Sequence, residues 1–251
     1  EVLQQQPDDI RRFLHVTAIL RQMTAEVCDC LRQAEDSTGI LSYLLANGLF
    51  VVDRGDGHLR YHHLFRELLI RQLPRPEAVA GHRRAATCYR KRGEAEAAIY
   101  HYLAAGEEEE AAALLVERGR ALVRAGRLDR LAGWIGSLSP DVLRRHSPLL
   151  AYLGDVARLR SRFEEALGWY QQAEARSRAT GDVAGVGQAL RGQARVYLDT
   201  VNPSKAERLL AEALRLSDGQ EDRESRARLL ELLAENLLNQ GRLGQAQAYQ
   251  E

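Results

Sequence analysis

Apolar residues recur at helical spacing in three groups within the first fifty positions. The groups are Ile10, Phe13, Leu14, Thr17 and Ile19–Leu20, then Val27, Cys28 and Leu31, then Ile40, Leu41, Leu44 and Leu45. A spacing of three or four residues places each group on one helix face. Thr24 precedes the second group as a capping residue. The pattern therefore predicts three helices.

The period then changes to one typical of strands. Leu49–Val52 and Leu59–Tyr61 are short apolar runs, and Arg54–Gly57 between them holds turn residues that tolerate positive φ. Helical spacing resumes over His63–Leu69. Three helices, a hairpin and a closing helix predict a winged-helix domain over residues 1–73.

A proline pair follows this domain. In Leu73-Pro74-Arg75-Pro76 each proline lacks a backbone donor and disfavours helix at the preceding residue. We expect a linker and the start of the first repeat helix over 74–81, and helices throughout 82–251.

The helical region is repetitive. Ala166, Ala206 and Ala246 are spaced by 40 residues. Two less regular copies of the repeat precede them, with the turns between their helices at Gly93 and Gly126. Small residues at fixed positions let the two helices of a hairpin approach closely. The pattern resembles tetratricopeptide repeats in a variant of about 40 residues, against the usual 34. The predicted fold is mainly α: a winged helix followed by an α-solenoid of about five hairpins, wound as a right-handed superhelix.

Charge is balanced over the 251 residues, with 35 Lys plus Arg and 35 Asp plus Glu. This balance argues against a strongly basic nucleic-acid-coating protein. Locally, residues 60–92 hold nine Lys or Arg and two Glu, a net of +7. The stretch is either a set of solvated arginine faces or a surface that faces an anion or an acidic domain.

Three cysteines, Cys28, Cys30 and Cys88, are an odd number without the spacing of a disulfide framework. We interpret them as small buried thiols and expect a reducing, cytoplasmic compartment.

A metal site built from Cys28 and Cys30 with His58, His62 or His63 is disfavoured. Residues two apart on a helix point in different directions, so both thiols cannot easily bind one ion. We expect no metal.

Catalytic and membrane signatures are missing from the sequence. It has no Gly-x-x-x-x-Gly-Lys-Ser/Thr loop, no His-Glu-x-x-His pair, no Gly-x-Ser-x-Gly turn and no apolar run of about 20 residues. We expect neither an enzyme nor a membrane protein. The missing initiator Met and the helical pattern at the last residues suggest a piece of a longer protein.

DNA binding through the winged helix is the least favoured reading. The helix that would enter the major groove, residues 37–47, has no Lys or Arg. The hairpin tip carries two acidic residues, Asp53 and Asp56, and one basic residue, Arg54. Base readout and phosphate neutralisation need donors and positive charge there. A protein-packing role is favoured.

Six motifs together carry a family resemblance. They are Phe13-Leu14-x-x-Thr17-x-Ile19-Leu20, Cys28-x-x-Leu31, Leu45-x-x-Gly48-Leu49-Phe50-Val51, Tyr61-His62-His63-Leu64-Phe65-x-x-Leu68-Leu69, His82-Arg83-Arg84-Ala85-Ala86-x-x-Tyr89 and Ala97-x-x-Tyr100-x-Tyr102-Leu103-Ala104-Ala105-Gly106. The chain resembles the maltose-regulator-like, large ATP-binding LuxR-type transcription activators, which belong to the STAND ATPases. The resemblance implies an ATPase module before this segment, an inducer-sensing repeat domain within it, and a DNA-binding helix-turn-helix after it.

The resemblance also implies a role for His62. Tyr61-His62-His63 occupies the hairpin-to-helix junction where related STAND proteins carry Met-His-Asp, whose histidine approaches the β-phosphate of bound ADP. By that match His62 would sense ATP or ADP in the full-length protein, with no cofactor held by this segment alone. The alternative is a histidine packed at the joint.

First-helix positions line the concave face of such solenoids. By this phasing the candidates for an inducer, protein or peptide groove are Asp155, Arg158, Gln193, Tyr197, Glu235 and Asn239. Their mixed charge indicates no ligand class, and ordinary solvated helix faces are the alternative. The favoured function is a sensor segment that couples ligand or partner binding to an ATPase switch; the runner-up is a plain tetratricopeptide scaffold.

Overall fold

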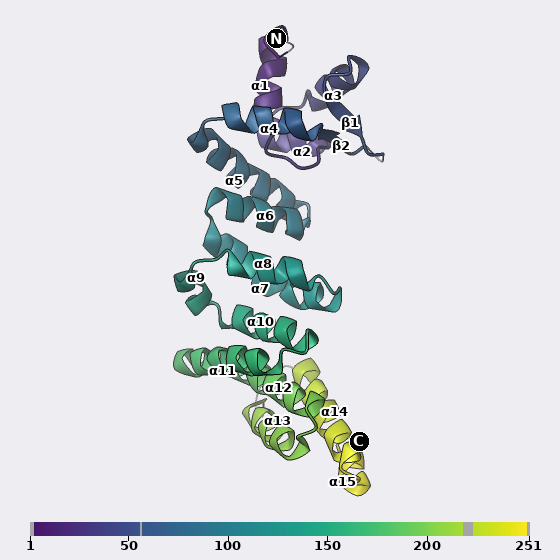
Figure 1. Cartoon of the computed structure of the whole chain (residues 1–251), viewed down its shortest axis with the longest axis vertical. Coiled ribbons are helices and arrows are strands. Elements are labelled where there is room, and N and C mark those ends of the chain that lie inside the picture. The colour runs from purple at the N-terminus through teal and green to yellow at the C-terminus, as the bar shows by residue number, and fades with distance from the viewer. Residues whose placement is uncertain (1–2, 56, 218–222, 250–251) are drawn as a thin grey trace. The chain divides into compact units, whose positions relative to one another are not determined.

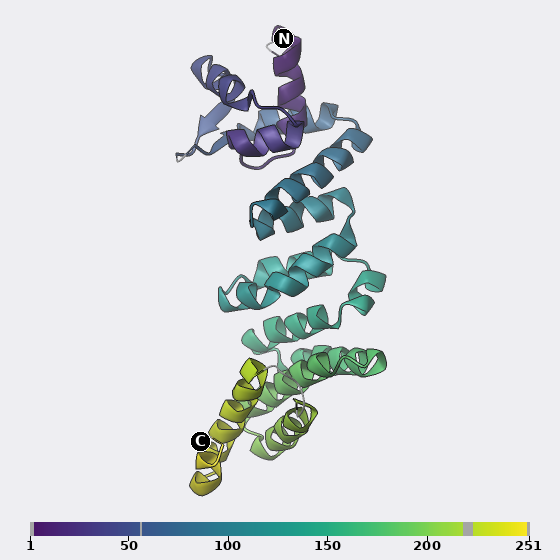
Figure 2. The ribbon, with the colours of Figure 1, turned by 180° about the vertical axis from the view of Figure 1, so that it is seen from behind.

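The computed structural model describes residues 3–55, 57–217 and 223–249, which contain helices α1 to α15 and strands β1 and β2 (Figures 1 and 2). The predicted mainly α fold is confirmed. The chain folds as two compact units, Glu1–Leu114 and Leu115–Glu251.

The first unit begins with the three predicted helices, α1 (Asp8–Thr17), α2 (Ala25–Arg32) and α3 (Ser37–Ala46). Thr24 caps α2, because its hydroxyl accepts a hydrogen bond of 3.4 Å from the backbone N–H of Val27.

A two-stranded hairpin and a helix complete the winged helix. Strands β1 (Val51–Asp53) and β2 (Leu59–Tyr61) pair antiparallel, with Val51 opposite Tyr61, and α4 (His63–Gln72) follows. An isolated bridge between Met23 and Leu59 extends the pairing, which the sequence pattern did not suggest.

A helical hairpin of α5 (Arg75–Lys91) and α6 (Ala95–Ala105) belongs to the same unit. Helix α4 ends at Gln72 and α5 begins at Arg75, so the prolines interrupt the helix where their chemistry predicts. Helix α5 packs against α2 of the winged helix.

The cysteine prediction was wrong for two of the three residues. Cys30 on α2 and Cys88 on α5 form a disulfide, with Cα atoms 6.1 Å apart and a sequence separation of 58 residues. Only Cys28 is a free buried thiol. The pairing depends on how α2 docks against α5, which spacing along the chain cannot reveal. It removes the cysteine argument for a reducing compartment.

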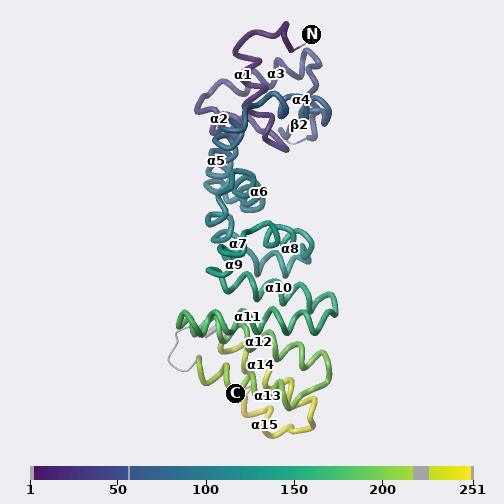
Figure 3. The backbone as a smooth tube through the Cα atoms, turned by 60° about the vertical axis from the view of Figure 1, so that its left-hand side comes forward, coloured from purple at the N-terminus to yellow at the C-terminus, as the bar shows by residue number. Residues whose placement is uncertain are grey.

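The second unit is built from helices alone in its described residues. They are α8 (Leu128–Gly136), α9 (Pro140–Arg145), α10 (Ser147–Leu159), α11 (Phe163–Thr180), α12 (Val183–Asp199), α13 (Pro203–Ser217), α14 (Arg223–Asn239) and α15 (Leu243–Gln247), preceded by α7 (Glu108–Arg124), which begins in the first unit. Helices α10 to α15 pack as successive antiparallel pairs, and Figure 3 shows them stacked along the chain.

The predicted repeat residues lie where these helices meet. Ala166, Ala206 and Ala246 are all completely buried. The Tyr170 ring of α11 lies over Gly154 of α10 and Gly192 of α12, where an added Cβ would stand 2.6 Å and 2.3 Å from its Cε1 atom. The tetratricopeptide-like packing is therefore confirmed.

Candidate functional site

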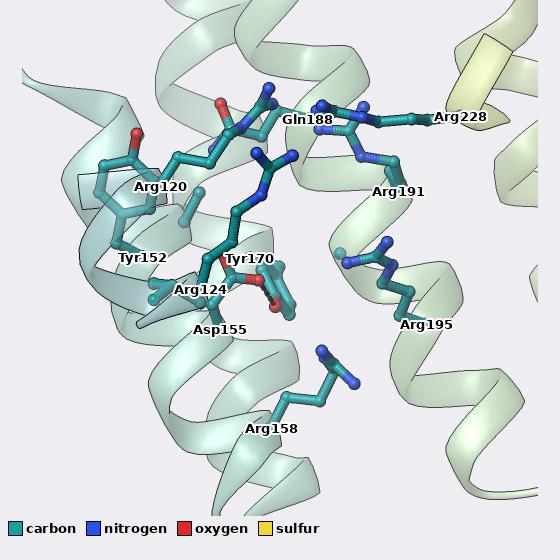
Figure 4. Close-up of a pocket in the computed structure, with 13 residues that line it drawn as sticks. Arg120, Arg124, Tyr152, Asp155, Arg158, Tyr170, Gln188, Arg191, Arg195 and Arg228 are labelled. Atoms are coloured by element: carbon teal, nitrogen blue, oxygen red, sulfur yellow. Dashed lines mark hydrogen bonds between the residues drawn. The ribbon is translucent and has the colours of Figure 1, made fainter. Parts of the chain in front are cut away.

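The second unit contains a partly open cavity of about 150 Å³ between the first helices of four of its hairpins. Helices α7, α10, α12 and α14 supply most of the wall, and Tyr170 of α11 reaches in (Figure 4). The lining residues are Arg120, Val123, Arg124, Ala151, Tyr152, Asp155, Arg158, Tyr170, Gln188, Arg191, Gly192, Arg195 and Arg228.

Arginine dominates this lining: six arginines face a single carboxylate, which gives a formal charge of +5. Two of the arginines are on α7 and two on α12, in each case four residues apart and hence on one helix face. In Figure 4 Arg191 and Arg195 extend from α12 into the same space as Arg120 and Arg124 from α7. We call this group of side chains the arginine cavity.

The floor of the arginine cavity is held by tyrosines. The Tyr170 hydroxyl donates a hydrogen bond of 2.7 Å to Asp155 Oδ1. The Tyr152 hydroxyl donates one of 3.0 Å to the Val116 carbonyl, and its ring packs where Gly119 has no Cβ. Burial raises the pKa of Asp155; the Tyr170 hydrogen bond and Arg158, Arg195 and Arg191 offset the rise only in part.

Most of the arginines lack an acidic partner. Arg158 donates a hydrogen bond of 2.9 Å from Nη1 to Asp199, while its Nε is buried without a hydrogen-bond acceptor. Among the residues whose side chains the structure describes (3–55, 57–216 and 226–249), four further lining arginines have no carboxylate within salt-bridge distance; they are Arg120, Arg124, Arg191 and Arg195.

The electrostatic consequence is clearest at Arg191. Burial, followed by the neighbouring charges of Arg120, Arg195 and Arg228, lowers the pKa of its guanidinium to about 10. Positive charge is therefore concentrated in the cavity, and at Arg120, Arg124, Arg191 and Arg195 no described carboxylate pairs with it.

The six groove candidates do not lie together in the structure. Asp155 and Arg158 line the arginine cavity, whereas the other four lie outside its lining. Gln193 is buried and donates a hydrogen bond of 2.6 Å to Glu174, and the ring of Tyr197 lies 5.1 Å from the Lys205 ammonium. The remaining two, Glu235 and Asn239, are exposed.

Five cavity arginines were not among the candidates. The sequence does contain a pattern that indicates them. The pairs Arg120/Arg124 and Arg191/Arg195 each place like charges on one helix face, which destabilises an isolated helix. Which pairs share a cavity is decided only by helix packing.

His62 lies at the hairpin-to-helix joint with an exposed side chain. Its backbone N–H donates a hydrogen bond of 2.7 Å to the Phe50 carbonyl, which fixes the joint. Tyr61 and Phe65 on either side are buried, and Tyr61 OH lies 2.6 Å from the Thr17 hydroxyl. The joint is thus packed by the neighbours of His62, while its own ring stands beside that of His63 at 4.9 Å.

Some arginines of the basic 60–92 stretch have structural partners. Arg66 donates hydrogen bonds to the carbonyls of Ile19 and Leu20. Arg83 pairs with Glu107, and Arg92 with Glu94 at 2.7 Å. These contacts account for part of the stretch without an external anion.

No cluster of three or more His, Cys, Asp or Glu side chains with metal-binding geometry occurs in the part of the chain that the structure describes. Within that same part, none of the helices combines the length and apolar character required to cross a bilayer.

Two family models match the chain. The MalT winged helix domain matches residues 1–80, and the tetratricopeptide repeat matches residues 147–219.

Two curated relatives align over most of the chain. The Serine/threonine-protein kinase PknK of Mycobacterium tuberculosis is 27% identical over 225 residues, covering 84% of this chain and 20% of the kinase. The HTH-type transcriptional regulator MalT of Cronobacter sakazakii is 27% identical over 221 residues, covering 85% of this chain and 24% of the regulator. The chain thus spans about a fifth to a quarter of the length of these relatives.

A solved structure shares the fold. A Signal Transduction ATPase with Numerous Domains (STAND) protein with a tetratricopeptide repeat sensor, from Pyrococcus horikoshii, superposes with a TM-score of 0.50 at 13% identity, over 99% of this chain and 50% of that one. The chain is therefore similar to MalT-like regulators: a match to the MalT winged helix domain over residues 1–80 is followed by a match to the tetratricopeptide repeat over residues 147–219.

Proposed function

We propose that this chain is the sensor and regulatory segment of a STAND-type signal-transducing transcription regulator. The observation that carries the proposal is the MalT-type winged helix over 1–80 followed in one chain by tetratricopeptide repeats. The repeats bind a signal, and the winged helix transmits it to an ATPase module outside these residues. Such a switch works if the signal binds one of two packings more tightly than the other.

The exposed face of α4 supports a docking role for the winged helix. Leu64 and Leu68 are four residues apart on that helix, and 62% and 46% of their surfaces are exposed. Exposed large apolar side chains that share a helix face are typical of protein contacts. His62 precedes this face directly, so a module docked there would meet its imidazole. In this proposal the histidine contacts the phosphate of ADP held by the ATPase module.

Repeats of this kind are non-enzymatic scaffolds. We propose that ATP binding and hydrolysis reside in the adjoining module, because the 251 residues contain no phosphate-binding loop. The pure chain should release no phosphate from ATP above a control without protein. Release above that control would contradict the assignment.

Substitution of His62 tests the coupling. In the full-length protein, His62→Ala should raise transcriptional output without inducer, because the resting ADP state loses a contact. His63→Ala is the matched control, since His63 is the exposed neighbour on the same joint. Unchanged basal output in His62→Ala, or an equal rise in both variants, would refute the phosphate-sensing role.

A plain protein-interaction scaffold is the second candidate. The observation in its favour is that the same segment aligns with a protein kinase as well as with a transcription regulator. The gene sequence separates the two: a phosphate-binding loop upstream and a helix-turn-helix downstream support the regulator, and neither is needed by a scaffold.

DNA contact belongs, in this proposal, to a domain outside these residues. Helix α3, which would read the major groove, carries no Lys or Arg. A cytoplasmic location is part of the proposal, and there the Cys30–Cys88 pair is expected to be reduced.

A further inference from the structure

The arginine cavity concentrates a charge that the rest of the chain does not share. Its lining carries a formal +5, whereas the whole chain is neutral. Bringing guanidinium groups together and partly removing them from water is unfavourable unless counter-charges are supplied. Packing brings them together from four helices that are distant in sequence.

The described side chains supply only part of that counter-charge. The one acidic side chain of the lining, Asp155, already accepts the Tyr170 hydrogen bond, and Asp199 pairs with Arg158. The guanidinium groups without a carboxylate partner in the described residues are Arg120, Arg124, Arg191 and Arg195. These donors are thus available to an external acceptor.

Guanidinium chemistry indicates the class of that acceptor. The planar fork of arginine matches the oxygens of phosphate and carboxylate, and charge-assisted pairs of this kind are the strong ones. A phosphoryl group carries up to two negative charges on three acceptor oxygens, whereas a carboxylate carries one charge on two. Several unpaired arginines around a small space therefore favour phosphoryl groups.

The size of the cavity restricts the ligand further. At about 150 Å³ it is smaller than the roughly 300–1,000 Å³ of pockets for drug-sized molecules. A nucleic acid or an extended acidic segment would leave most of its length outside. A compact anion with closely spaced charges uses the available donors best.

We propose that the arginine cavity binds a small anion bearing at least two phosphoryl groups, with Arg120, Arg191 and Arg195 as its principal contacts. The lowered pKa of Arg191 is in keeping with this, because an anion would offset the repulsion that Arg120, Arg195 and Arg228 exert on it. The ligand would join α7, α10, α12 and α14, and so tie several repeat hairpins together.

The proposed anion would be the signal that the repeats sense, so its biological role rests on the proposed sensor function. Binding itself is measured on the 251-residue chain without any ATPase module. Failure of binding and failure of the His62 coupling are therefore seen in different experiments.

The test compares anions at matched ionic strength by calorimetry and thermal unfolding. Inorganic diphosphate is the probe, with inorganic phosphate, citrate and chloride as comparators. We expect diphosphate to bind and to raise the Tm, as a ligand of the folded state must. Inorganic phosphate should bind at least tenfold more weakly, and diphosphate affinity should fall as salt rises.

Arg191→Met gives a signature that a structural arginine would not give. The variant should weaken diphosphate binding at least tenfold, yet its own Tm without ligand should be equal or higher, because one repelling charge is removed while the long side chain is kept. Arg176→Met, at an exposed position of α11 outside the cavity, is the matched control and should bind as the unmodified chain does.

Several results would overturn the proposal. They are no diphosphate binding beyond the chloride control, binding of citrate or inorganic phosphate as tight as that of diphosphate, and equal weakening by Arg176→Met. A fall in the ligand-free Tm of Arg191→Met would show that Arg191 serves packing instead.

Discussion

The Tyr170 hydroxyl donates a 2.7 Å hydrogen bond to Asp155, the one carboxylate in the lining of the arginine cavity. The bond joins α11 to α10 within one repeat hairpin and orients the carboxylate among the surrounding arginines. One side chain thus serves both the packing of the repeat and the electrostatics of the cavity.

Removal of this hydroxyl should therefore destabilise the chain. Tyr170→Phe keeps the ring but leaves the half-buried carboxylate without its donor, which costs about 1–3 kcal/mol. Urea unfolding measures the change. Tyr43→Phe is the control, since its hydroxyl bonds Gln6 at an exposed position, and its effect should stay below about 0.5 kcal/mol. Equal losses in both variants would argue against a special role for the Tyr170–Asp155 pair.

The close approach of α11 and α12 should not tolerate a methyl group. In Gly192→Ala the new Cβ would lie 2.3 Å from the buried Tyr170 ring, so the helices must separate, at a cost of about 1–3 kcal/mol. Gly187→Ala on the same helix meets no atom within 4 Å and should stabilise by about 0.5–1 kcal/mol. Thermal unfolding of both variants checks the opposite signs. A stable Gly192→Ala protein would contradict the packing.

Val201, in the turn between α12 and α13, should be replaceable with a gain in stability. Its φ is +55°, a left-handed conformation that is strained for a β-branched residue, and 86% of its surface is exposed. Val201→Gly should stabilise by about 1 kcal/mol, because strain is relieved without loss of packing. The reverse change, Gly241→Val at φ +74°, should destabilise. A lower unfolding midpoint for Val201→Gly, or a higher one for Gly241→Val, would contradict the explanation by backbone strain.

Stability should fall as the pH drops below neutrality because of His101. Its Nδ1 lies 2.8 Å from His82 Nδ1, and burial, followed by the electrostatic influence of His82, Arg21 and Arg66, lowers its pKa to about 3. The rings of Tyr89 and Tyr100 also pack against the His101 ring. Neither ring carries a negative charge that would stabilise a protonated imidazole. The unfolded chain, with a histidine pKa near 6.5, binds the proton more readily, so protonation favours unfolding.

From pH 7 to pH 5 this histidine should cost about 2 kcal/mol of folding stability. Urea titrations at both pH values, compared with His101→Gln, isolate the contribution. The variant should show a smaller loss over that interval than the unmodified chain. Identical losses would show that another group controls the pH dependence.

Reduction of the Cys30–Cys88 disulfide should loosen the first unit. The bond links α2 to α5 across a sequence separation of 58 residues, and constraining such a loop stabilises by about 2–4 kcal/mol. Unfolding with and without dithiothreitol measures the difference. A Cys30→Ala/Cys88→Ala variant should not respond to the reductant, because burial raises the pKa of Cys28 to about 12 and keeps that thiol inert. A reductant effect of equal size in the variant would exclude the disulfide as its cause.

The sequence by itself determined the secondary structure and the repeat. Helical spacing, the strand-like runs and the prolines indicate where α1 to α4 and the hairpin lie, because these are local properties of neighbouring residues. They did not indicate that α1 ends at Thr17, before Ile19 and Leu20. The recurring alanines at 166, 206 and 246 identified the faces along which the helices pack, because only small residues permit that approach.

Only the tertiary structure decided which distant residues meet. Cys30 and Cys88 pair because α2 docks on α5, and the arginines of α7, α10, α12 and α14 share a cavity because successive hairpins stack. Neither relationship has a fixed sequence spacing, since each depends on the angle and depth at which helices pack. Neutral overall charge concealed the cavity for the same reason: a charge sum runs along the chain, whereas electrostatic potential depends on distances in space.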